Sequence, residues 1–253
     1  MNEALILQHV ETYKKNILMQ LQQSTLQKYT GIPVIDEDRL FFTILPFLNE
    51  EDWDNSVEVS AIAVSLIFSA LAAHDLVKEE NATAKSQQLQ VLAGDYYSGR
   101  YYQLLASENK IDLIQLLSNS VAIITEHKSR FYDLEDYTLE ELIQSIQLIE
   151  SKPIERFLEY YAYHEYVYIM NEALLLAALK KELVAFENNE KTFYISKSKI
   201  LQSNMDTLRL EIEKIELTLV QDVRSSNLLN ESLKDAILER VSNHSLEKQL
   251  REG

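Results

Sequence analysis

The sequence lacks residue types that whole classes of protein need. Its 253 residues include no cysteine, which excludes disulfides, thiolate metal sites and cysteine nucleophiles. Only four glycines and three prolines are present, and this scarcity of turn residues argues against a loop-rich β protein and for long helices. Because 46% of the residues are hydrophobic, the chain is able to bury a sizeable core.

Positive charge is also scarce. Lys and Arg total 24 against 40 Asp and Glu, a net charge of −16. Such a chain repels nucleic-acid phosphates and anionic membrane surfaces, so we expect no nucleic-acid binding and no stable membrane anchoring. The most apolar run, residues 61–73, is too short to span a bilayer, and the acidic Glu3 is untypical of a signal peptide. We therefore expect a cytoplasmic protein.

Motifs for catalysis and metal binding are missing as well. The sequence has no Asp-Asp dipeptide, no HxH or HExxH, and no GxSxG, P-loop or GxGxxG. Because these patterns place metal ligands, nucleophiles or phosphate-binding amides together, their absence predicts no catalytic, cofactor-binding or metal-binding residue in this chain. Four histidines lie apart from any motif: His9, His127, His164 and His244.

What is present is helical periodicity throughout, which predicts one all-α domain over residues 1–253. The Asp36–Asp38 acidic run should begin a helix, and Pro153 should break or kink one. Residues 57–77 form the most apolar segment and should be central. The other expected helical regions cover residues 2–29, 89–106, 112–132, 139–149, 154–186, 203–222 and 229–241. The first has Leu5, His9, Thr12, Asn16 and Met19 on one face, and an interruption near Tyr163–His164 is expected in 154–186.

Two of the four glycines, Gly94 and Gly99, lie inside one expected helix. A glycine in a helix costs about 1 kcal/mol relative to alanine, so the pair indicates close packing of this helix against a neighbour. Tyr97 and Tyr101 lie one turn apart on the same helix. Tyrosine is enriched at protein interfaces, so both residues are candidates for contact with a partner protein.

One local sequence pattern narrows the class of protein to which the chain is similar. The segment His74-Asp75-Leu76-Val77-Lys78-Glu79, followed by Leu-Ala-Gly-Asp at 92–95, resembles the trans-isoprenyl diphosphate synthases, which carry an aspartate-rich DDxxD just after a helix and a second such motif about a hundred residues later. The resemblance implies a single helical bundle of that fold. Here the first motif is degenerate: Asp75 and Glu79 survive, but Leu76 cannot ligate Mg²⁺. The region of the second motif has only scattered carboxylates: Glu165, Glu172 and Glu182.

Four segments in the first part of the chain are similar to the small, noncatalytic subunits (component 1) of bacterial two-component heptaprenyl diphosphate synthases. They are residues 33–40, 73–80, 88–105 and 126–133. The resemblance implies a cytoplasmic heterodimer in which a catalytic large subunit holds Mg²⁺ and the prenyl diphosphates. This chain would be required for activity and help set product length, but would not be catalytic alone. The product would supply the menaquinone side chain.

The resemblance also implies a partner interface. Synthases of this type pair through central helices, so the expected interface comprises Gly94, Tyr97, Gly99 and Tyr101. Two alternatives stay open on the residues alone. An all-α scaffold without an enzymatic partner would have the same composition, and a stand-alone terpene-related enzyme would need unusual metal ligands. His74, Asp75 and Glu79 are either a residual metal site or a helix end with solvated charges, and Asp95 is expected to have a structural role.

Overall fold

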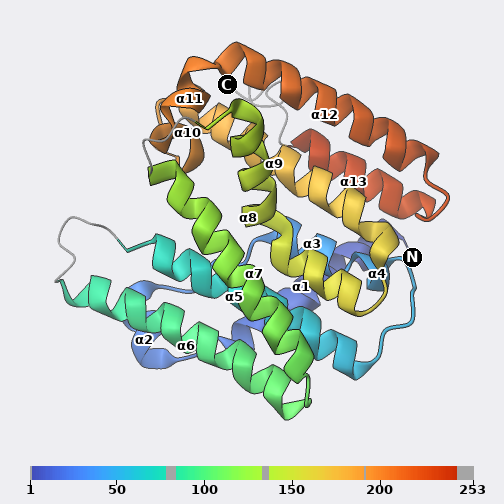
Figure 1. Cartoon of the computed structure of the whole chain (residues 1–253). Helices are drawn as coiled ribbons and strands as arrows, with labels where there is room; N and C mark the ends of the chain where they lie inside the picture. The colour runs from blue at the N-terminus through green and yellow to red at the C-terminus, as the bar shows by residue number, and fades with distance from the viewer. Residues whose placement is uncertain (1, 78–83, 133–136, 191, 244–253) are drawn as a thin grey trace. The chain divides into compact units, whose positions relative to one another are not determined.

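The computed structural model describes residues 2–77, 84–132, 137–190 and 192–243, and every regular element in these ranges is a helix (Figure 1). The prediction of an all-α protein is therefore confirmed. The chain divides into two compact units, each described here by itself. Unit 1 comprises residues 1–119 and 156–162, and unit 2 comprises residues 120–155 and 163–253. The boundary falls inside two long helices, so the expected single domain over 1–253 stays a prediction.

The helices of unit 1 are α1 (Glu3–Gln20), α2 (Ser24–Thr30), α3 (Glu37–Thr43), α4 (Leu45–Leu48), α5 (Asn55–Asp75) and α6 (Lys85–Ser107). Two helices have residues in both units, α7 (Ile111–Ser129) and α8 (Leu139–Tyr160). The elements of unit 2 are η1 (Arg130–Tyr132), η2 (His164–Tyr166), α9 (Val167–Glu187), α10 (Tyr194–Lys197), α11 (Lys199–Ser203), α12 (Met205–Ser225) and α13 (Glu231–Asn243).

Helix α5 is the core of unit 1. It begins where the Asp54 side chain accepts a hydrogen bond from the Val57 N–H, at 2.8 Å, which satisfies one free amide of the first turn. By length and composition α5 is apolar enough to cross a membrane, but 72% of its apolar window is buried inside the structure. A helix that is apolar on all sides and covered by its neighbours is a core helix.

Helices α5 and α6 are antiparallel neighbours. The Gln90 side chain of α6 donates a hydrogen bond to the Ala73 carbonyl near the end of α5, at 3.2 Å, and the two ribbons run side by side in Figure 1. Helix α2 also packs on α6. The expected start of α3 is confirmed, because the Asp36 carboxylate accepts hydrogen bonds from the amides of Asp38 and Arg39.

In unit 2, α12 and α13 pack against α9. The fully buried ammonium of Lys180, on α9, lies 2.6 Å from the Glu216 carboxylate of α12 and donates to the Val241 carbonyl of α13 at 3.1 Å. This cation therefore sits at the C-terminal end of α13, where it opposes the negative end of the helix dipole. A buried charge with only one of these partners would be costly, so Lys180 ties three helices together.

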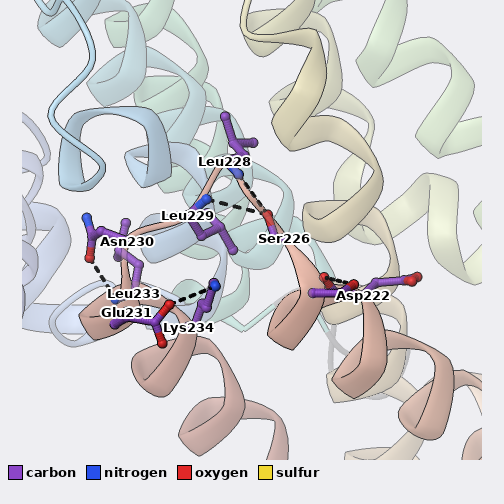
Figure 2. Close-up of polar contacts among 9 residues, drawn as sticks. Asp222, Ser226, Leu228, Leu229, Asn230, Glu231, Leu233 and Lys234 are labelled. Carbon is purple, nitrogen blue, oxygen red and sulfur yellow. Dashed lines mark hydrogen bonds and ion pairs between the residues drawn. The ribbon is translucent and has the colours of Figure 1, made fainter.

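A tight turn joins α12 to α13 (Figure 2). The Ser226 hydroxyl accepts hydrogen bonds from the amides of Leu228 and Leu229, at 3.2 and 3.4 Å. The Asn230 side chain then accepts from the Leu233 amide at 3.1 Å and caps α13. Side-chain oxygens thus replace the helix carbonyls that these amides lack, which is how a polar turn ends one helix and starts the next.

Three sequence-based expectations about helices were wrong. Residues 2–29 are two helices, α1 and α2, rather than one. The buried face of α1 is formed by Ile6, Val10, Tyr13 and Ile17, not by the face of Leu5 and Met19, because the apolar run near residue 5 is compatible with several faces and packing selects one. The expected break at Pro153 does not occur, because helix α8 continues through it, whereas the expected kink there stays a prediction.

Candidate functional site

The degenerate aspartate-rich motif lies where α5 ends and α6 begins, in unit 1. Helix α5 ends at Asp75, and the Leu76 amide still donates to the Ala72 carbonyl at 3.3 Å. Asp75 is exposed, and Leu76 is 60% exposed at the position where catalytic synthases would carry the second aspartate. Glu79, the other surviving acid of the motif, lies outside the described residues.

His74 and the glycine of the Leu-Ala-Gly-Asp segment are in direct contact. The His74 ring lies over Gly94, so closely that a Cβ at residue 94 would be 2.5 Å from the His74 Nε2 atom. The same Nε2 is 3.7 Å from the Asp95 Oδ1 atom. A Cβ at residue 94 would therefore displace the His74 ring, which crosses α6 at Gly94. Asp95 is thus a neighbour of that ring, and the structural role expected of it stays a prediction.

The described residues at this end do not by themselves fit a magnesium site. Mg²⁺ requires several oxygen ligands in near-octahedral geometry, and Leu76 offers none. In the part of the chain that the structure describes, no group of three or more His, Asp or Glu side chains is arranged to hold a metal ion. Asp75 and Asp95 are the described acids of this end, and Asp95 faces an imidazole.

Two cations of α6 in the described part of the chain, Lys85 and Arg100, bind the chain's own groups. The Lys85 ammonium donates to the Tyr29 hydroxyl at 3.3 Å and lies over the Tyr29 ring, 4.7 Å from its centroid. The Arg100 guanidinium donates to the Gln20 carbonyl at 3.2 Å and to the Gln20 side chain. Both cations therefore attach α6 to α1 and α2.

Two of the three carboxylates named in the second-motif region, in unit 2, also bind protein groups, whereas Glu165 is exposed. Glu182 accepts from the amides of Phe193 and Ile195, at 3.2 and 2.8 Å, and so positions the segment that contains α10. Glu172 accepts from Gln147 at 2.9 Å; burial, and to a smaller extent the nearby charge of Asp222, raises the pKa of its carboxyl group.

Helix α6 has two different faces. Tyr97 and Tyr101 are only 3% and 4% exposed, and burial raises the pKa of both hydroxyls. With Gly94 they face the interior of unit 1. Gly99 faces the other way: it is exposed, and a Cβ added to it would meet no atom within 4 Å. Of the four residues expected at a partner interface, Gly99 alone is on the surface of this chain.

The exposed face of α6 carries apolar side chains around Gly99. Leu92 and Tyr102 are exposed, two turns before and nearly one turn after the glycine. The Tyr102 ring stacks on the buried Tyr101 ring, with centroids 4.2 Å apart, so its position is fixed by the core. We call Leu92, Gly99 and Tyr102 the outer face of α6.

Two features of the structure were not found from the sequence. One is the buried Lys180. Its position directly after the apolar run 173–179 of α9 is a sequence signal that could have indicated its burial. The other is a small cavity of about 30 Å³ beside Arg39, between α3 and α5. The segment 33–40 was noted only for its resemblance, because the cavity is formed by residues about thirty positions apart.

The fold is that of the isoprenyl diphosphate synthases. The structure is similar to a decaprenyl diphosphate synthase from Rhodobacter capsulatus, with a TM-score of 0.70 and 14% identity, covering 96% of this chain and 97% of the other. It is also similar to a heptaprenyl diphosphate synthase from Staphylococcus aureus, with a TM-score of 0.61 and 16% identity, covering 94% and 91%. At these identities the likeness shows the fold alone.

The family is shown by the sequence itself. The model of the heptaprenyl diphosphate synthase subunit 1 family matches residues 24–231, and the chain therefore belongs to this family. Component 1 of heptaprenyl diphosphate synthase from Geobacillus stearothermophilus is 33% identical over 132 residues, which are 52% of this chain and 60% of that protein. The match thus spans about three fifths of the relative's length.

Proposed function

We propose that this chain is the noncatalytic subunit of a two-component heptaprenyl diphosphate synthase. The observation that supports this most strongly is a contrast. The chain has the fold of the catalytic synthases and belongs to a subunit 1 family, yet Leu76 stands at a ligand position. To take part in prenyl transfer, a synthase fold that lacks ligands for Mg²⁺ needs a second chain that supplies them.

The partner is a catalytic large subunit with both aspartate-rich motifs. It holds Mg²⁺, the allylic diphosphate and isopentenyl diphosphate, which reach this chain only within the complex. Carboxylates one turn apart on facing helices provide the hard oxygen ligands that the metal needs. In this chain Glu172 and Glu182 bind protein groups instead, so we assign it no metal and no cofactor.

The partner contacts α6 through its outer face. Leu92 and Tyr102 are exposed apolar side chains, and exposed apolar surface on an acidic protein marks an interface. Gly99 has no reason within this chain to be glycine, since a Cβ there would meet open space. A partner side chain or backbone that approaches α6 closely at this point explains the glycine.

The chain acts on product length by supporting the partner rather than by chemistry. Ile67 and Ala70, upstream of the degenerate motif, are buried in unit 1, where they pack in its core. A rigid bundle of this kind orders the helices of a subunit packed against it. The heptaprenyl product supplies the side chain of menaquinone, and the complex works in the cytoplasm.

An activity assay with separated subunits tests the proposal. The purified chain, a candidate large subunit and their mixture are each given farnesyl diphosphate, labelled isopentenyl diphosphate and Mg²⁺. We expect long-chain product only in the mixture. Full turnover by this chain alone would identify a stand-alone enzyme. If the large subunit is fully active without this chain and the two do not bind, the alternative of an all-α scaffold protein without an enzymatic partner explains the chain better.

A further inference from the structure

One end of unit 1 exposes large aliphatic side chains. Val34 and Ile32 are 80% and 74% exposed, more than any other large apolar side chain in the described ranges. Val34 and Ala72 line the same cavity, and Leu76, one turn beyond Ala72 on α5, is exposed as well. We call Ile32, Val34 and Leu76 the apolar end.

The segment that carries Ile32 and Val34 is anchored on both sides. Gly31 closes α2 with a positive φ of 81°, a conformation that glycine adopts without strain. Ile35 is buried, and Asp36 then caps α3 through two backbone amides. The two side chains between these anchors are therefore held outward by the fold.

The cavity lies directly beside this segment. Its walls are lined by Val34, Ile35, Asp36, Arg39, Leu40, Ser65, Phe68, Ser69 and Ala72. The Arg39 guanidinium lies 4.4 Å from the centroid of the Phe68 ring, and the hydroxyls of Ser65 and Ser69 donate back to carbonyls of α5. The cavity lining thus combines hydrocarbon, from Val34, Phe68 and Ala72, with the polar groups of Asp36 and Arg39, and its volume of about 30 Å³ leaves room for a small group only.

We propose that the apolar end and its cavity form a second contact region for the large subunit. This inference rests on the proposed function. A stable interface buries about 800 Å² on each partner, whereas the outer face of α6, from Leu92 to Tyr102, covers only about 15 Å of one helix. The partner must therefore cover more of unit 1, and the apolar end offers exposed hydrocarbon and a receiving cavity.

Charge decides what kind of surface fits there. Asp36 and Asp75 are exposed beside the apolar end, and the chain as a whole carries −16. A second copy of this chain would bring the same charge and be repelled. The complementary surface is an apolar side chain surrounded by Lys and Arg, which we expect on the large subunit.

The double variant Ile32→Asp/Val34→Asp tests this contact. Both side chains are mostly exposed, so the free chain should keep its helical circular dichroism and its unfolding midpoint. Its Kd for the purified large subunit, measured by titration calorimetry, should rise tenfold or more. Leu210→Asp, on α12 of unit 2, is the matched control: Leu210 is 65% exposed, and its replacement should leave the Kd within twofold of the wild-type value.

Ala72→Leu tests the cavity separately, because it fills the space without adding charge. We expect weaker binding of the large subunit, again with an unchanged unfolding midpoint. If the wild-type chain does not bind the large subunit at all, the proposed function fails. If the wild-type chain binds, and the double variant and Ala72→Leu bind equally well, the apolar end is not a contact and only this inference is overturned. The inference would also be overturned if these variants lost binding between copies of this chain but kept binding to the large subunit.

Discussion

The two faces of α6 carry the same kinds of residue for different reasons. Gly94, Tyr97 and Tyr101 face the interior of unit 1, and Gly99 and Tyr102 face outward. The inner glycine makes room for the His74 ring, whereas no atom of this chain lies near the outer one. The comparison teaches that one face of the helix maintains the fold and the other is available to a partner. Substitutions on each face should therefore affect different measurements.

The largest expected effect is on the stability of the free chain, when the tyrosines of the two faces are compared. Tyr97→Ala removes a buried ring and should lower the free energy of unfolding by about 3–5 kcal/mol. Tyr102→Ala removes a partly exposed ring that stacks on Tyr101 and should cost about 1 kcal/mol or less. Urea unfolding followed by circular dichroism measures both. Equal losses would contradict the division into two faces.

The second-largest expected effect is on binding of the large subunit, when a charge is placed on the outer face of α6. Gly99→Glu should fold normally, because residue 99 is exposed, but weaken binding of the large subunit about a hundredfold, because an unpaired charge in an interface is costly. The measurement is the Kd from calorimetry, together with the activity of the mixture. Gly99→Ala is the size control. If Gly99→Glu assembles into a fully active complex, α6 does not contact the partner.

A smaller effect separates the two glycines. Gly99→Ala should stabilise the free chain by about 0.5–1 kcal/mol, because alanine is the better helix former and its Cβ meets open space. Gly94→Ala should lose this gain, because its Cβ would collide with the His74 ring and displace it. Unfolding midpoints of the two variants provide the test. The same gain at both positions would mean that Gly94 is not required by His74.

The smallest effect concerns the pair His74 and Asp95, 3.7 Å apart and largely exposed. Solvent screens such pairs, so Asp95→Asn should change the unfolding free energy by about 0.5 kcal/mol or less. A double-mutant cycle with His74→Ala measures the coupling between the two residues. A coupling well above 1 kcal/mol would show that this contact, rather than the packing of α5 on α6, holds the inner face in place.

Much of the fold was predictable because helix formation depends on residues that are close together in the sequence. The scarcity of glycine and proline, the Asp36 cap and the apolar segment 57–77 predicted an all-α protein with a central α5, and the structure confirms it. The division of residues 2–29 was missed, because the Gln22–Gln23 boundary lacks the usual helix-ending residues. Pro153 was overrated, since packing of the surrounding helix outweighs the one hydrogen bond that proline removes.

Less of the candidate site was predictable. The absence of the aspartates and the membership of the family could both be predicted from the sequence, because a motif is a local pattern of residue types. Which of Gly94, Tyr97, Gly99 and Tyr101 reach the surface was not, because a 3.6-residue period says that a helix has faces but not which face a neighbour covers. The burial of three of them follows from the packing of α5 and α2 against α6.

The sequence by itself determined the helical class, the family and the loss of the aspartate pair, since each depends on residue types at short spacing. Only the tertiary structure decided that Gly94 accommodates His74 while Gly99 faces outward, that Lys180 joins three helices, and that Val34 borders a cavity with Ala72. These contacts join residues that are 20 to 60 positions apart. Such pairings depend on close packing of whole helices, which no local pattern of side chains specifies.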